Sequence, residues 1–112
     1  MKLMKLKELN SRDVFEFSYG SNYNEEIFAE HWNENSLFMS DEDFSKLSKY
    51  INKVIEDFNY MGPNKIDLEK WFEMKNIVIN SNKSELFDFI NTIDDWLNLD
   101  PYKTNYFWIL GV

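Results

Sequence analysis

The sequence predicts an α+β fold, in which three to four helices pack on a small sheet within one helix-rich domain, residues 1–112. Residues 13–19 and 105–112 carry the alternating or consecutive β-branched and aromatic side chains that are typical of strands. Between them, apolar residues recur at helical spacing in several segments. A chain of 112 residues, 44% of them hydrophobic, has the size of one domain with its own core.

The first strand is predicted at residues 13–19, DVFEFSY, with Phe15, Phe17 and Tyr19 on one face. Gly20-Ser21-Asn22 would end it, because these residues favour turns.

A short amphipathic helix is predicted next, from residue 24 to about residue 35. Its acidic stripe would consist of Glu26, Glu30 and Glu34, which recur every four residues. The apolar arc of the same helix would carry Ile27, Phe28, His31 and Trp32.

A second helix is predicted at residues 41–59. Ser40 is its expected N-cap, and Asp43 three residues later makes a variant of the capping box. The lysines of its outer face are balanced by Glu56 and Asp57, so this face should be nearly neutral. The apolar face would consist of Phe44, Leu47, Ile51, Val54, Ile55 and Phe58.

The stretch MGPN, residues 61–64, should break the chain, since Gly and Pro end helices. After it, residues 66–75 predict a short helix and residues 76–80, NIVIN, a buried strand, with a longer strand as the alternative.

The last helix is predicted to begin after Asn82, which pairs with Glu85 as a second capping box, and to end near Leu97, before Asp100-Pro101. The strand at residues 105–112, NYFWILGV, is apolar on both faces, which favours a central place in the sheet. The helix would bury Leu86, Phe89, Ile90, Ile93, Trp96 and Leu97.

Catalytic and metal-binding signatures are absent from the sequence. It has no cysteine and one histidine, too few for a zinc site or for an activated nucleophile, and no Gly-rich phosphate loop or EF-hand spacing. A pair of carboxylates acting as general acid and base stays open as an alternative. We therefore expect no enzymatic activity, no cofactor and no metal.

The formal net charge is −8, which repels a phosphate backbone and attracts a basic protein surface. The expected partner is therefore a basic protein rather than nucleic acid. No run of about 18 apolar residues and no signal-peptide pattern occurs, and cysteine is absent, so we expect a soluble, cytoplasmic protein without membrane contact.

Negative charge gathers on two of the predicted helices. Asp88, Asn91 and Asp95 share one arc of the last helix without a lysine, as Glu26, Glu30 and Glu34 do on the first. Like charges four residues apart do not stabilise a helix, so these arcs predict a binding face; the alternative is an ordinary solvated surface. Asp94, Asp95, Asp100 and Tyr102 would form an edge where an aromatic anchor adjoins the charges.

The chain resembles the small acidic immunity proteins that accompany bacterial contact-dependent growth inhibition and related polymorphic toxins. The resemblance lies in its Lys/Asn/Phe/Trp-rich composition, in SLFMSDEDFSKLSKYINKVIEDF, residues 36–58, and in DPYKTNYFWILGV, residues 100–112. It implies an antidote that binds the toxic C-terminal domain of a secreted effector, often a nuclease. The alternative is a phage-type acidic inhibitor, a DNA mimic that targets a nucleic-acid-binding enzyme.

Overall fold

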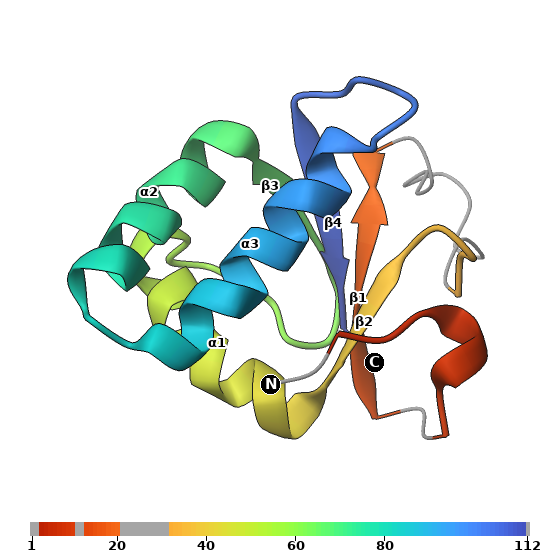
Figure 1. Cartoon of the computed structure of the whole chain (residues 1–112), viewed down its shortest axis with the longest axis horizontal. Coiled ribbons are helices and arrows are strands. Elements are labelled where there is room, and N and C mark those ends of the chain that lie inside the picture. Colours follow the sequence, from red (N-terminus) through yellow and green to blue (C-terminus); the bar gives the residue numbers. More distant parts are fainter. Residues whose placement is uncertain (1–2, 11–12, 21–31, 112) are drawn as a thin grey trace.

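The computed structural model describes residues 3–10, 13–20 and 32–111. It is an α+β domain in which three α-helices pack on a four-stranded antiparallel sheet, as the sequence predicts (Figure 1). No helix in these ranges is long and apolar enough to cross a lipid bilayer. In chain order the elements are η1 (Leu6–Glu8), β1 (Val14–Tyr19), β2 (Leu37–Ser40), α1 (Asp41–Val54), β3 (Pro63–Asp67), α2 (Leu68–Asn80), α3 (Ser84–Asn98) and β4 (Tyr106–Leu110).

The strands lie in the order β2-β1-β4-β3. The last strand, β4, is central, as its two apolar faces predict, and it pairs with β1 through Phe17 and Ile109 and with β3 through Ile66 and Phe107. Strands that are far apart in the sequence, β1 and β4, thus pair in the middle of the sheet, and its stability depends on contacts between distant parts of the sequence.

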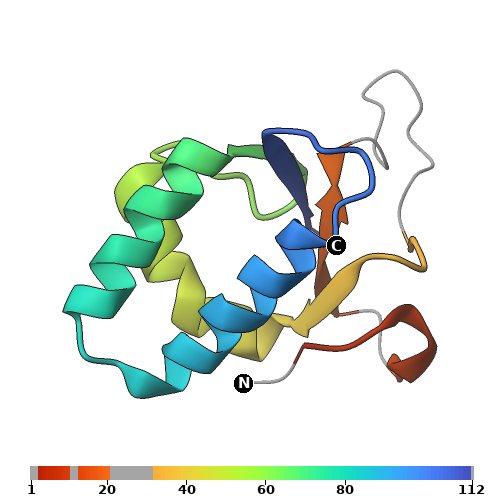
Figure 2. The same cartoon turned by 45° about the horizontal axis from the view of Figure 1, so that its top comes forward.

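The three α-helices cover one face of the sheet (Figures 1 and 2). Phe15, Phe17 and Tyr19 all point into the core beneath them, which confirms the predicted face of β1. Phe17 is fully buried, and its ring centroid lies 6.0 Å from that of Phe89 on α3. On the opposite face of β4, Trp108 and Leu110 form a separate buried cluster with Tyr106.

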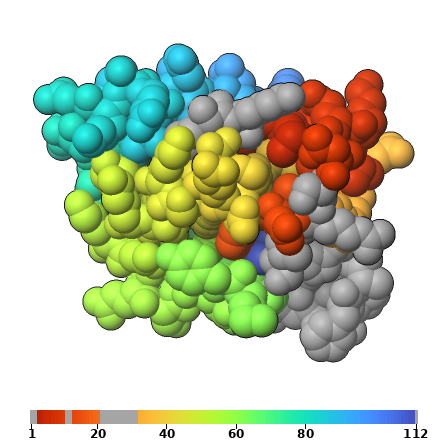
Figure 3. Space-filling view, turned by 90° about the horizontal axis from the view of Figure 1, so that it is seen from below, coloured from red at the N-terminus to blue at the C-terminus, as the bar shows by residue number. Residues whose placement is uncertain are grey.

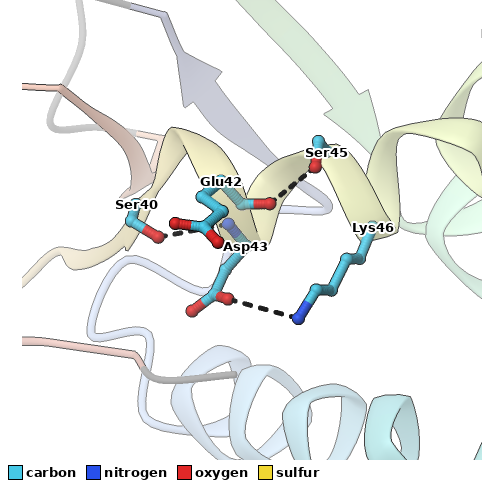
Figure 4. A network of polar contacts seen from close by, with 5 residues as sticks. All are labelled: Ser40, Glu42, Asp43, Ser45 and Lys46. Atoms are coloured by element: carbon cyan, nitrogen blue, oxygen red, sulfur yellow. Dashed lines mark hydrogen bonds and ion pairs between the residues drawn. The ribbon is translucent and has the colours of Figure 1, made fainter.

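Helix α1 begins where the sequence predicts. The Ser40 hydroxyl accepts a hydrogen bond from the backbone N–H of Asp43 at 3.1 Å, and Lys46 lies 3.9 Å from the Asp43 carboxylate (Figure 4). The helix ends at Val54, however, and the predicted continuation to residue 59 is wrong. Figure 3 shows the molecule from below, where α1 (yellow) lies between the end of α2 (teal) and the connection to β3 (green).

A side-chain clamp accounts for the early end of α1. The Asn64 side chain accepts a hydrogen bond from the backbone N–H of Asn59 at 2.8 Å and donates one to the Asn59 carbonyl at 2.7 Å. Phe58 folds back onto Phe44, with 5.7 Å between ring centroids. Negative side chains at the C-terminal end of a helix are also unfavourable, and Glu56 and Asp57 follow directly.

The predicted strand at residues 76–80 is wrong, because α2 continues through it to Asn80. Trp71, Met74 and Val78 are buried at helical spacing, so packing against the core overrides the β-propensity of the Ile-Val-Ile run. The edge strands β2 and β3 were not predicted. β2 has only four residues, and β3 starts at Pro63, which an edge strand tolerates because one side needs no backbone donors.

Helix α3 buries the predicted face, but Asn82 does not cap it. Asn82 has a left-handed φ of 58° and donates its backbone N–H to the Ile79 carbonyl, so it closes the end of α2 instead. Lys83 occupies the N-cap position of α3 without a side-chain bond.

Most of the predicted helix at residues 24–35 lies outside the described residues, including His31, Glu26 and Glu30. Its described end, residues 32–35, forms a bend and a turn, so the helix does not reach residue 35.

Candidate protein-binding surface

The exposed face of α3 carries a group of acidic side chains without ion-pair partners among the described residues. Asp88, Asn91 and Asp95 are all exposed on it, as the sequence predicts. The whole exposed face is polar, and it consists of Ser84, Glu85, Asp88, Asn91, Thr92, Asp95 and Asn98.

No ion pair within the described ranges involves Glu85, Asp88 or Asp95. Asp95 stands in the last turn of α3, where the helix dipole favours a cation, and that turn has no basic residue. Such a placement costs about 0.3–1 kcal/mol of stability. The position of Asp95 is therefore not explained by the stability of the helix, whereas Glu85 stands in the first turn, where the helix dipole favours a carboxylate.

Helix α1 offers the contrast within the same fold. Lys46 pairs with Asp43, and the ammonium groups of Lys49 and Lys53 each lie 5.4 Å from the centroid of the Tyr50 ring. The outer face of α1 is thus supplied with cations, while the outer face of α3 has none.

Asp94 has an internal role that the sequence did not reveal. Its carboxylate accepts a hydrogen bond from the indole N–H of Trp71 at 2.8 Å and forms an ion pair with Lys75 at 2.5 Å. Both partners lie on α2, so Asp94 joins α2 to α3. Its carboxylate is already engaged, which corrects the expectation that Asp94 belongs to an open binding edge.

Asp100 is also engaged within the protein. It is only 4% exposed, and its carboxylate accepts hydrogen bonds from the backbone N–H of Tyr102 at 2.8 Å and from the Thr104 hydroxyl at 2.9 Å. These bonds hold the turn between α3 and β4, as an Asp side chain commonly does. Of the predicted edge, Asp95 and Tyr102 are exposed, Tyr102 by 47%, while Asp94 is only partly exposed and Asp100 is buried.

Tyr19, the last residue of β1, packs against the C-terminal end of α3 and has a shifted pKa. The Tyr19 hydroxyl donates a hydrogen bond to the Trp96 carbonyl at 2.6 Å, and its ring stacks on the Trp96 indole with 4.3 Å between centroids. Burial, with the nearby negative charge of Asp100, raises the pKa of Tyr19 from 10.0 to about 12.

We expect this shift to weaken the fold in alkali. Between pH 10 and about 12 the unfolded chain has lost the Tyr19 proton while the folded chain retains it, so the free energy of unfolding falls as pH rises. Relative to a Tyr19→Phe variant, the wild type should lose up to about 2 kcal/mol across this range. Urea unfolding of both proteins at several pH values measures the difference, and parallel pH curves would contradict it.

Glu34 lies in the turn that follows the residues left undescribed, and its side chain is exposed. The indole N–H of Trp96 on α3 donates to the Asn35 carbonyl at 2.8 Å, which fastens this turn against the C-terminal half of α3. Glu26 and Glu30, the other members of the predicted stripe, lie outside the described residues.

The turn is organised by Glu16, a buried residue of β1 that the sequence reasoning missed. Its carboxylate accepts hydrogen bonds from the backbone N–H groups of Trp32 and Asn33, at 2.6 and 3.1 Å, and from the Ser36 hydroxyl at 2.7 Å. A single acidic residue between Phe15 and Phe17 was the available signal, because a buried carboxylate requires such donors.

The described residues contain no cluster of acidic or histidine side chains that could hold a metal ion. An open hollow of about 520 Å³ is bordered by Lys5, Leu6, Lys7 and Glu34.

The polar face of α3 thus remains the best candidate for a functional surface among the described residues. No family model, curated protein or solved structure matches the chain.

Proposed function

We propose that this protein is an immunity protein that binds and neutralises the toxic domain of a cognate bacterial effector in the cytoplasm. It contacts the toxin through the acidic face of α3 and has no catalytic activity of its own. The observation that carries the proposal is the set of three exposed carboxylates, Glu85, Asp88 and Asp95, that no described cation neutralises.

Rigidity supports this role. Helix α3 is held by five buried side chains and by the Asp94 contacts with α2, so its carboxylates are presented at set distances. Binding to a preformed surface avoids the entropy of ordering a flexible segment.

The proposed target is a nuclease. A nuclease holds phosphates with Lys and Arg, and an acidic face complements such a cleft or the basic surface beside it. The net charge of −8 adds long-range attraction, which speeds association with a basic partner.

Capture and co-expression test the function. The tagged protein should retain a basic partner from its native host, the isolated partner domain should arrest growth when expressed alone, and co-expression should restore growth. A captured domain that is not toxic, or whose toxicity co-expression leaves unchanged, would refute the antidote role. A captured DNA-binding enzyme without a toxin gene beside the chain's own gene would favour the phage-type inhibitor.

A further inference from the structure

Helix α2 exposes two large apolar side chains that its own packing does not use. Phe72 is 51% exposed and Ile79 is 50% exposed, whereas the helix is anchored through Trp71, Met74 and Val78. Phe72 and Ile79 are seven residues apart, so they lie on one side of α2 and about 10.5 Å apart along its axis. They form an apolar row on the outer surface.

This row borders α3. Lys75 lies one turn from each member of the row, its ammonium group is 5.3 Å from the centroid of the Phe72 ring, and it pairs with Asp94 on α3. The ion pair neutralises Lys75 at the joint between the helices. The apolar row of α2 and the polar face of α3 thus lie on either side of the Lys75–Asp94 ion pair.

The acidic row of α3 has the same pitch. Asp88 and Asp95 are also seven residues apart, which places them about 10.5 Å apart along their helix. An apolar row and an acidic row with equal spacing therefore lie on two neighbouring helices, with the Lys75–Asp94 pair between them.

We propose that this α2–α3 surface, defined by Phe72, Ile79, Asp88 and Asp95, is the docking site for a basic amphipathic helix of the partner. Apolar side chains of that helix pack on Phe72 and Ile79, while its Lys or Arg side chains meet Asp88 and Asp95. Helices commonly dock in this way, through apolar anchors repeated at i and i+7. The inference rests on the proposed function and specifies which part of the partner is bound.

Charge selects this occupant over two others. A second copy of the chain, docked about a two-fold axis on the same surface, would place each acidic row against the other acidic row or against an apolar row, and neither supplies a cation. A bilayer surface carries negative potential, which a chain with net charge −8 opposes. A cationic amphipathic helix supplies apolar side chains for the row on α2 and positive charges for the row on α3.

A synthetic peptide provides the test. The probe is a helical Leu/Lys peptide with its leucines on one face, and its control is a scrambled peptide of the same composition without an apolar face. Binding is followed by fluorescence anisotropy and by NMR shifts of backbone amides. We expect the amphipathic peptide to perturb α2 and α3 and to bind at least about tenfold more tightly than the scrambled one.

Variants of the protein locate the site. The double change Phe72→Ser and Ile79→Ser should weaken the amphipathic peptide about tenfold, while Met61→Ser, at a side chain 83% exposed outside this surface, should not. Both Phe72 and Ile79 are half exposed, so circular dichroism should show an intact fold. Equal affinity for the two peptides, or unchanged affinity of the Phe72/Ile79 variant, would overturn the docking site.

Four further outcomes test this site against its rivals and separate it from the proposed function. Self-association that disappears in the Phe72/Ile79 variant, seen by sedimentation, or binding of the wild type to anionic vesicles would overturn it. Growth protection that survives the Phe72/Ile79 changes but fails on reversal of Asp88 and Asp95 would also overturn it, while the proposed function stands. If the peptide binds with the expected dependence on Phe72 and Ile79, but capture from the native host yields no toxin, the docking site is supported and the antidote role is refuted.

Discussion

Replacing Phe107 with alanine is expected to lower the free energy of unfolding by about 3–5 kcal/mol. Phe107 is fully buried on the central strand, and its ring centroid lies 5.7 Å from that of Trp71 on α2 and 6.1 Å from that of Trp96 on α3. The ring therefore joins the sheet to two helices, and alanine would leave a cavity between them. Urea unfolding, followed by tryptophan fluorescence and circular dichroism, measures the loss.

The matched control is Phe72→Ala, the same chemical change at a residue 51% exposed on α2. It should cost less than about 1 kcal/mol, because little packing is removed. Domains of this size are stable by about 5–15 kcal/mol, so the Phe107 variant could lose much of its folded population at moderate temperature. Equal losses at the two positions would contradict the arrangement of β4 beneath the helices.

Reversing the charges of Asp88 and Asp95 to lysine is expected to slow association with the partner about tenfold or more at low ionic strength. Both side chains are exposed on α3 and neither has an ion pair among the described residues, so helical content should be unchanged. The difference between variant and wild type should shrink as salt is added, because the Debye length falls from about 10 Å at 0.1 M to about 3 Å at 1 M. Surface plasmon resonance at several salt concentrations gives both rates.

The control for net charge is the double change Glu56→Lys and Asp57→Lys after α1, which alters the total charge equally. It should slow association much less, since only its long-range contribution is lost. Binding that tolerates the α3 reversal and is indifferent to ionic strength would show that this helix is not the contact face. Equal slowing by both variants would show that the effect comes from net charge alone and not from the position of the charges on α3.

The sequence alone was sufficient for the elements whose pattern is local. The alternation of Phe15, Phe17 and Tyr19 placed β1, the Ser40 cap placed the start of α1, and the helical spacing around Ile90 placed the buried face of α3. It also located the exposed arc of Asp88, Asn91 and Asp95, since residues opposite a buried face must meet solvent.

Tertiary packing decided the rest. Residues 76–80 carry β-branched side chains but remain helical because Val78 packs into the core beside Met74, a contact that local propensity does not contain. Asp94 and Asp95 are adjacent in the sequence and equal in charge, yet Asp94 meets Trp71 and Lys75 while Asp95 is exposed. Charge is a property of the residue, but its availability to a partner depends on the side chains that the fold brings opposite it.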